Sequence, residues 1–206
     1  MIKNPKDLQR YTAPERANHW MVGISFILLA LSGLALFHPL FWPLTNLFGG
    51  GTWTRILHPY VGLLMALSFL GLFARFAALN SITPTDREWL SRVGEMVNGD
   101  DHNMPASGKY NGGQKLLFWA LTLCMLLLTV SGLVMWRAWF DLPVGMVRLG
   151  VVVHAATAAV MIGLITLHVY AAIWVKGSIR AMLYGTVTRA WARQHHRGWY
   201  RQLTGK

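Results

Sequence analysis

Long apolar stretches dominate the chain and alternate with more polar connections. Four windows of 19 to 27 residues contain no Asp, Glu, Lys or Arg: 19–37, 56–74, 116–136 and 149–175. A helix rises about 1.5 Å per residue, so each window has the length that a hydrocarbon core of roughly 30 Å requires. The pattern predicts an all-α integral membrane protein in which residues 1–206 form a single domain, a bundle of four transmembrane helices.

The composition agrees with this prediction, because 54% of the residues are hydrophobic. All eight acidic residues lie outside the four windows, so chemistry within the membrane does not depend on a carboxylate. The single cysteine, Cys124, excludes an internal disulfide, a CxxCH haem attachment and an iron–sulfur cluster held by thiolates of this chain.

The distribution of positive charge predicts the orientation. Residues 1–18, 75–115 and 176–206 carry 16 of the 19 Lys and Arg residues. Because Lys and Arg favour cytoplasmic loops, both termini and the middle loop are predicted to be cytoplasmic. The net charge of +11 then reflects topology and an anionic inner leaflet, and it does not indicate nucleic-acid binding.

The cytoplasmic tail, residues 176–206, has a pattern of its own. Over residues 177–200 Arg alternates with Trp, Met, Leu and Tyr. This predicts a basic helix that lies along the inner membrane surface. Contact with a partner subunit is the alternative.

Four histidines lie in the apolar windows: His19, His58, His154 and His168. With the predicted orientation, His58 and His154 share the outer half of the membrane, and His19 and His168 share the inner half. His154 and His168 are 14 residues apart. One helix therefore presents both within about 40° of the same face, separated by roughly 21 Å along its axis.

An imidazole in lipid is costly unless it is ligated or hydrogen-bonded. For one histidine alone, a hydrogen bond between helices explains the residue equally well. Two depth-matched pairs instead favour two bis-histidine haems b. Zinc is the weaker alternative, because two imidazoles without a nearby Cys, Asp or Glu fall short of its usual four ligands. The other four histidines fall in loops or in the tail and are not expected to bind haem: His38, His102, His195 and His196.

A faint internal repeat relates the two helical hairpins. LSGLALF at 31–37 and HPYVGLLM at 58–65 align with VSGLVMW at 130–136 and HAATAAVM at 154–161. His58 and His154 are equivalent in this alignment, which supports pairing them. His19 and His168 have no counterparts.

Several longer segments carry a family resemblance: YTAPERANHW at 11–20, RILHPYVG at 55–62, GKYNGGQKLLFW at 108–119 and HVYAAIWVKGSIRAMLYGTVTRAWARQHHRGWYR at 168–201. In order and spacing they resemble the gamma subunit of bacterial respiratory formate dehydrogenase, its cytochrome b membrane anchor. The resemblance covers nearly the whole chain.

The resemblance implies two haems b as cofactors. His58 and His154 would be the axial ligands of the periplasmic haem, and His19 and His168 those of the cytoplasmic haem. It also implies that a quinone, menaquinone or ubiquinone, is reduced near the inner haem, at a site that matches Asn111, Gly113 and Gln114 with His168 close by.

The resemblance further implies partner subunits. An alpha subunit containing molybdenum or tungsten would oxidise formate in the periplasm, and an iron–sulfur beta subunit would pass the electrons to the outer haem. The chain itself would anchor the complex in the bacterial inner membrane and carry electrons to quinone. Surrounding lipid and a trimer of heterotrimers complete the expected assembly.

Alternative interpretations remain open at this point. NGGQ at 111–114 could bind a quinone carbonyl through its amide groups and glycine backbone, or Asn111 could only cap a helix. For the whole chain, one alternative is the dihaem anchor of a nickel–iron hydrogenase or another respiratory reductase, which differs in the donor that reduces the haem. A haem-free anchor or transporter is the other, and it would show no Soret absorbance.

Overall fold

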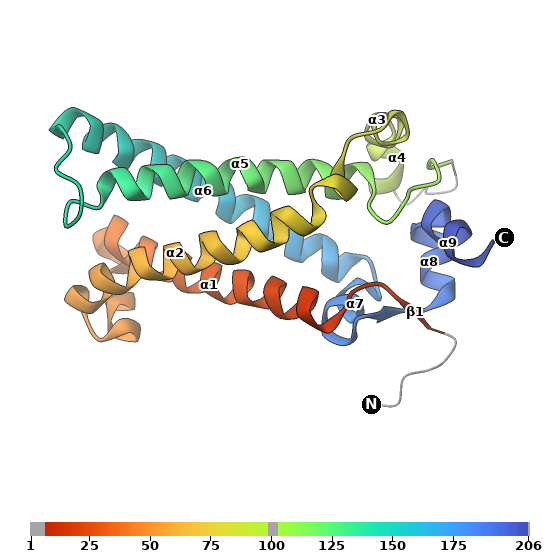
Figure 1. Ribbon diagram of the computed structural model, residues 1–206, viewed down its shortest axis with the longest axis horizontal. Helices are drawn as coiled ribbons and strands as arrows, with labels where there is room; N and C mark the ends of the chain where they lie inside the picture. The colour runs from red at the N-terminus through yellow and green to blue at the C-terminus, as the bar shows by residue number, and fades with distance from the viewer. Residues whose placement is uncertain (1–6, 99–102, 206) are drawn as a thin grey trace. The chain divides into compact units, whose positions relative to one another are not determined.

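The fold is seen in a computed structural model that describes residues 7–98 and 103–205. Lys3 and Lys6, which belong to the predicted cytoplasmic charge, and His102 lie outside these ranges. The described chain is nearly all helical (Figure 1). Four long helices are apolar enough to cross a membrane: α1 Ala13–Phe37, α2 Gly51–Phe76, α5 Gly112–Met135 and α6 Val144–Trp174. The predicted fold class, with four membrane-spanning helices, is confirmed.

Each long helix begins a few residues before its apolar window, in polar sequence. Capping and turn residues mark the start of α1 and α2. The amide and hydroxyl of Thr12 both donate to Glu15 Oε2, at 2.6 and 2.8 Å, where α1 begins. Such a carboxylate in the first turn satisfies donors that the helix itself leaves open. The start of α2 follows Gly49 and Gly50, whose φ angles of 85° and 95° favour glycine.

Shorter elements connect the long helices. They are η1 Pro39–Phe48, η2 Ala78–Asn80, α3 Pro84–Ser91, α4 Val93–Val97, α7 Ser178–Tyr184, α8 Arg189–His195 and α9 Arg197–Thr204. Two strands, β1 Leu8–Gln9 and β2 Thr186–Val187, pair antiparallel, with Leu8 opposite Val187 and Gln9 opposite Thr186.

The tail differs from the single interfacial helix that its pattern predicts. It divides into α7, β2, α8 and α9. Gly185 ends α7 with a φ angle of 81°, and its carbonyl accepts hydrogen bonds from the amides of Arg10 and Tyr11 at 2.8 and 3.1 Å. Thr188 then caps α8 by accepting from the amide of Trp191 at 3.1 Å. Pairing with the amino-terminal segment therefore breaks the helix, and periodicity along the tail does not reveal it.

Contacts divide the chain into two compact units, which we name and describe separately. The span unit comprises Ala17–Ala74 and Leu121–Leu167, and the tail unit comprises Met1–Arg16, Arg75–Ala120 and His168–Lys206. A cluster of Met65, Cys124, Met125 and Met161 forms the core of the span unit. The core of the tail unit consists of Ala181, Val187, Trp191, Ala192 and Trp199.

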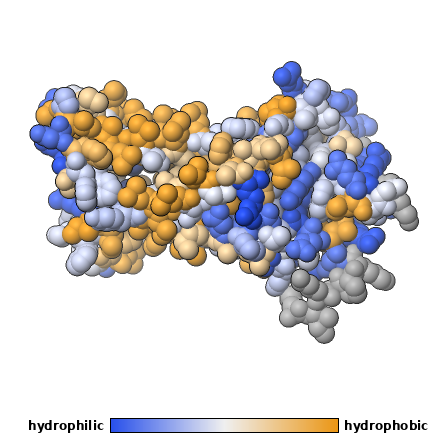
Figure 2. Space-filling model, viewed as in Figure 1, coloured by the Kyte–Doolittle hydropathy of each residue, from blue (hydrophilic) through white to orange (hydrophobic). Residues whose placement is uncertain are grey.

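The surface of the long helices is apolar. Large side chains that remain exposed on them include Ile24, Leu67, Leu126 and Val152. Figure 2 shows these helices covered largely by hydrophobic residues. A surface of this kind is stable against lipid and not against water.

Candidate functional site

Two of the predicted ligands, His58 on α2 and His154 on α6, lie together in the span unit. Their ring centres are 6.2 Å apart and the ring planes are inclined by 65°. Two imidazoles bound to opposite sides of one metal ion would have ring centres roughly 6.4 Å apart, given about 2.0 Å from metal to nitrogen and about 1.2 Å from that nitrogen to the ring centre. The spacing therefore fits the axial ligands of a haem iron.

A serine holds each of these rings. Ser32 Oγ lies 2.8 Å from His58 Nδ1, and Ser131 Oγ lies 3.0 Å from His154 Nδ1. Both serines are buried, at 3% and 4% exposed. Because Nδ1 is occupied in each ring, Nε2 is the nitrogen that is left to bind a metal.

A glycine beside each serine leaves room for the ring. A Cβ atom added at Gly33 would lie 3.3 Å from His58 Cε1, and one added at Gly132 would lie 3.4 Å from His154 Cε1. The distance at Gly33 is tighter than an ordinary carbon contact, and the distance at Gly132 lies at its lower limit. Glycine therefore lets each ring approach the neighbouring helix closely.

The structure supports the internal repeat. The Ser–Gly pairs occupy equivalent positions in the two copies and make equivalent contacts. Met65 and Met161, each seven residues after its histidine, are both 3% exposed in the same core cluster. Sequence reasoning used the repeat to pair the histidines but assigned no role to the serines and glycines, although LSG and VSG were its visible signal.

The inner pair is placed differently. His19 belongs to the span unit and His168 to the tail unit, so their pairing stays a prediction. Within residues 7–98 and 103–205, no three or more His, Cys, Asp or Glu side chains gather where they could hold a metal ion.

The predicted quinone residues form the start of α5 in the tail unit. The amide of Gln114 donates to Asn111 Oδ1 at 2.9 Å, and the amide of Asn111 donates to Gln114 Oε1 at 3.1 Å. This reciprocal pair is a helix cap. In the part of the chain that the structure describes, no bond is made by the side-chain nitrogens, Asn111 Nδ2 and Gln114 Nε2. Capping and ligand binding are thus compatible, because they use different atoms of the same amides.

Gly113, whose backbone the sequence interpretation offered to a quinone, packs closely against α3, and its part in quinone binding stays a prediction. A Cβ atom there would lie 2.9 Å from the ring of Trp89 on α3. At Gly112 it would lie 2.6 Å from the carbonyl oxygen of Asp86. The two glycines let α5 start directly against α3.

A buried ion pair anchors the same helix start. Lys115 Nζ lies 2.7 Å from Asp86 Oδ2, and it also donates to the carbonyl of Ser81 at 3.0 Å. Burial raises the pKa of Asp86, but hydrogen bonds from Lys115 and Thr83 outweigh it and hold that pKa below its usual value. Lys109 is half-buried, and burial lowers its pKa.

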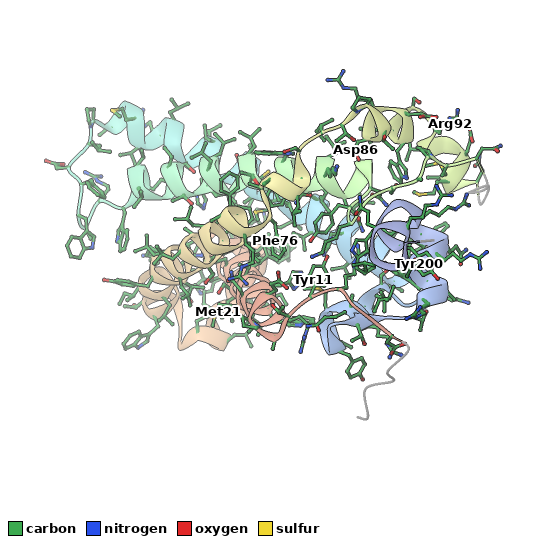
Figure 3. All side chains as sticks on the ribbon, turned by 45° about the vertical axis from the view of Figure 1, so that its right-hand side comes forward. Tyr11, Met21, Phe76, Asp86, Arg92 and Tyr200 are labelled. Carbon is green, nitrogen blue, oxygen red and sulfur yellow. The ribbon has the colours of Figure 1, made fainter. Side chains whose placement is uncertain are left out.

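A second polar cluster joins three distant segments of the tail unit. Arg10 is 5% exposed, and its Nη2 donates to the carbonyl of Lys109 at 2.6 Å and lies 3.2 Å from His196 Nε2. His196 Nδ1 lies 2.9 Å from the carbonyl of Gly108. The guanidinium is 5.0 to 5.8 Å from the centres of four aromatic rings: Tyr11, Tyr110, Trp191 and Trp199. Figure 3 shows Tyr11 and Phe76 from this region, whose rings make an edge contact at 6.3 Å.

His196 is the buried histidine that sequence reasoning assigned to the basic tail. It is 1% exposed. Burial and the positive charge of Arg10 lower the pKa of His196 to about 3. Both ring nitrogens are engaged, which agrees with the prediction that this residue does not bind haem.

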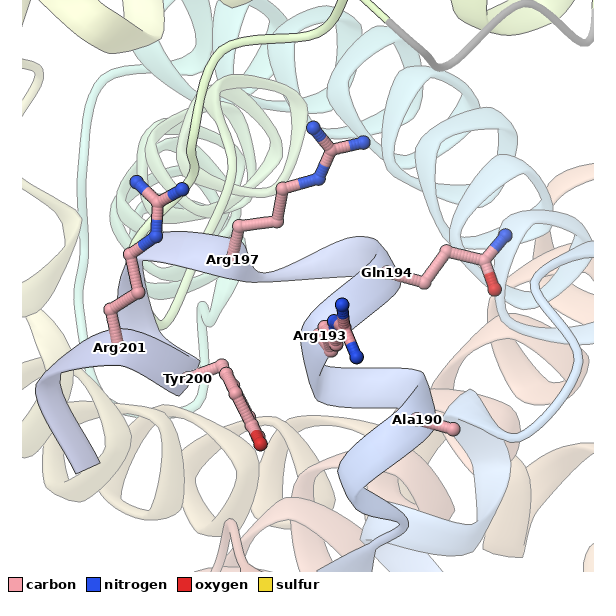
Figure 4. Close-up of a pocket in the computed structure, with 6 residues that line it drawn as sticks. All are labelled: Ala190, Arg193, Gln194, Arg197, Tyr200 and Arg201. Carbon is pink, nitrogen blue, oxygen red and sulfur yellow. The ribbon is translucent and has the colours of Figure 1, made fainter. Parts of the chain in front are cut away.

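The tail also forms an open basic pocket. Figure 4 shows its lining residues: Ala190, Arg193, Gln194, Arg197, Tyr200 and Arg201. Three of the six are arginines and none is acidic, so the lining carries net positive charge.

Comparison with known proteins places this geometry in a family. The sequence model of the prokaryotic cytochrome b561 family matches residues 10–185. The chain is 41% identical to the cytochrome b556(fdo) subunit of formate dehydrogenase from Escherichia coli, over 98% of this chain and 96% of that protein. It is 40% identical to the nitrate-inducible cytochrome b556(Fdn) subunit of the same species, with 92% and 88% covered. The formate dehydrogenase cytochrome b556 subunit of Haemophilus influenzae is 38% identical, with 98% and 85% covered. The chain therefore belongs to the prokaryotic cytochrome b561 family, among the cytochrome b subunits of formate dehydrogenases, and is a multi-pass membrane protein of electron transport.

Proposed function

We propose that this chain is the dihaem membrane subunit of a formate dehydrogenase complex. As a single membrane domain it anchors an iron–sulfur subunit and a molybdenum- or tungsten-containing catalytic subunit in the bacterial inner membrane, with both termini cytoplasmic. Formate oxidation belongs to the catalytic subunit, and this chain carries the electrons inward to quinone. Two haems b, when bound, supply one-electron carriers at two depths of the membrane.

The outer pair carries this proposal. His58 and His154 have the 6.2 Å ring spacing of two axial ligands, and each ring keeps Nε2 available because a buried serine occupies Nδ1. Similarity to formate dehydrogenase subunits over nearly the whole chain supports the assignment of the complex. His19 and His168 are proposed as the inner ligands from the depth pairing and the family resemblance.

The cytoplasmic end of α5 supports quinone binding. Asn111 and Gln114 use their side-chain oxygens in the helix cap, which fixes both amides in position. Their NH2 groups can then donate to a quinone carbonyl. Gly113 and the Lys115–Asp86 ion pair hold the segment against α3, and His168 completes the proposed site.

The first experiment is an anaerobic difference spectrum of membranes that contain the intact complex, recorded on addition of formate, with haem counted per chain. Two b-type haems reduced by formate are expected. Two haems that respond only to hydrogen would reassign the chain to a hydrogenase anchor, and the absence of haem would refute the proposal.

The quinone site is tested separately with Gln114→Glu and Gln114→Ala. The Glu variant keeps the oxygen that accepts from the amide of Asn111 but removes the NH2 donors. We expect both variants to leave the haems reducible by formate and to slow quinone turnover. If Gln114→Glu turns over quinone at the normal rate while Gln114→Ala is slow, the residue acts only as a cap.

A further inference from the structure

The repeated Ser–Gly pairs do more than pack two helices. Each serine contacts the same ring nitrogen of its histidine, in two hairpins that are far apart in the sequence. We propose that Ser32 and Ser131 are positioning residues for the outer haem, which fix the tautomer of its two ligands and lower its reduction potential. The inference rests on the proposed function, since it takes His58 and His154 as axial ligands.

The direction of each hydrogen bond follows from a count of protons. Ser32 Oγ donates to the carbonyl of Leu28 at 2.7 Å, and Ser131 Oγ donates to the carbonyl of Leu127 at 2.6 Å. A hydroxyl has a single proton, which is committed to the carbonyl one turn back in the helix. Ser32 Oγ must therefore accept a proton from His58 Nδ1, and Ser131 Oγ one from His154 Nδ1. Each ring is then protonated on Nδ1, with the lone pair of Nε2 free for iron.

The serines also fix the orientation of the rings. Both hydroxyls are buried and bonded to helix backbone, so neither rotates freely. The adjacent glycines bring Cε1 of each ring against the helix, so that a Cβ atom added there would already touch it, at 3.3 Å for Gly33 and 3.4 Å for Gly132. Together, one hydrogen bond and one close contact restrict each imidazole to a single orientation.

An acceptor at Nδ1 also changes the electronic character of the ligand. When Nδ1–H donates to Ser Oγ, the ring becomes more basic and Nε2 donates more charge to a bound metal. The chain from Nδ1–H through the hydroxyl to a helix carbonyl strengthens this effect, because successive hydrogen bonds polarise one another. A more basic ligand favours ferric over ferrous iron. Two serines acting on the same metal therefore lower its reduction potential.

A lower reduction potential is consistent with the place of the outer haem in the electron path. Electrons that move inward do so against the membrane potential of an energised cell. A lower potential at the outer haem keeps transfer to the inner one favourable. The serines would thus bias the direction of electron flow without touching either partner subunit.

The test is a potentiometric titration of the intact, purified complex with Ser32→Ala, Ser131→Ala and the double variant. Haem content and low-temperature electron paramagnetic resonance of the oxidised protein are measured in parallel. Each single variant should move the outer midpoint potential to a more positive value, and the double variant should move it further. The signal of the oxidised outer haem should shift as its ligand orientations relax, and the inner haem should keep its potential.

Matched variants make the result decisive. Ser25→Ala removes another buried serine of α1, two turns from Ser32, and should leave both potentials unchanged. Ser32→Thr retains the hydroxyl and should retain the native potential. An unchanged outer potential in the double variant, with both haems bound, would overturn the inference. If Ser32→Ala loses the haem, retention of haem by Ser32→Thr supports the role of the hydroxyl, and loss in both overturns it.

Failure of the proposed function would look different. His154→Ala identifies the outer haem, because this variant should lack it. If the native complex contains no haem, or if His154→Ala keeps two, the ligand assignment itself is wrong. If these two controls behave as expected and the serine variants have no effect, only the inference about the serines fails.

Discussion

The two units each hold a sequestered histidine, but they use its nitrogens differently. In the tail unit, both nitrogens of His196 are engaged, Nδ1 with the carbonyl of Gly108 and Nε2 with Arg10. In the span unit, His154 has Nδ1 bound to Ser131, and its Nε2 is left for a metal. Burial alone therefore does not distinguish a ligand from a structural histidine, since His196 is only 1% exposed. The two histidines differ in how many ring nitrogens are hydrogen-bonded.

The same contrast extends to charge. Burial, and then the positive charge of Arg10, keep His196 neutral. This histidine serves as a hydrogen-bond bridge between the tail and the segment before α5. The apolar windows that hold His58 and His154 contain no formal charge. A neutral imidazole with one nitrogen available can bind iron, whereas a neutral imidazole with both nitrogens hydrogen-bonded stabilises the fold.

The largest effect is expected when a proposed haem ligand is removed. His154→Ala should lose the outer haem, leave one haem per chain and block the reduction of the inner haem by formate. Pyridine haemochrome analysis of the purified complex and a formate difference spectrum measure both effects. Two haems in this variant would show that His154 is not a ligand.

A smaller effect is expected when the ring is displaced rather than removed. Gly132→Val puts atoms where a Cβ alone would be 3.4 Å from His154 Cε1. Overpacking of this kind costs about 1–3 kcal/mol, so haem occupancy at the outer site should fall without being abolished. Gly163→Ala is the control, on the same helix as His154, because no atom lies within 4 Å of the added Cβ. Equal haem content in the two variants would contradict the tight fit.

The structural histidine should behave in the opposite way. His196→Ala removes the ring that contacts Arg10 Nη2 and leaves the carbonyl of Gly108 without its partner. A buried polar group that loses its partner costs about 1–3 kcal/mol. We expect faster proteolysis of the tail, with both haems retained. His196→Gln keeps one donor and one acceptor and should restore part of the resistance. Loss of haem in His196→Ala, with an intact tail, would be the contrary outcome.

The smallest effect is a pH dependence of the same contact. The pKa of His196 is lowered to about 3, whereas an unfolded histidine titrates near 6.5. The unfolded tail therefore takes up a proton that the folded tail does not, and stability falls as the pH drops from about 6.5 toward 3. Hydrogen exchange of residues 189–205 at pH 7 and pH 5, corrected for intrinsic rates, should show loosening that His196→Gln reduces. Asp86 acts in the same direction only at lower pH, because its pKa is depressed as well.

Much of the fold follows from local properties of the sequence. The four spanning helices were predicted because the length and apolarity of a window determine whether it can cross a bilayer, whatever it packs against. Depth, supported by the internal repeat, paired His58 with His154, and the structure brings them together. The repeat already contained the serines and glycines, but only coordinates show that they reach the histidine rings.

Local sequence patterns therefore suffice to predict the spans, the candidate ligands and the family. Tertiary contacts are needed to see that a serine occupies Nδ1 of His58 and of His154, how the tail is divided and what holds the segment before α5. These features depend on contacts between distant residues, such as Arg10 and His196, which are 186 positions apart. Hydrophobic periodicity reports the solvent around each segment. It does not report which polar atoms meet when the chain folds back on itself.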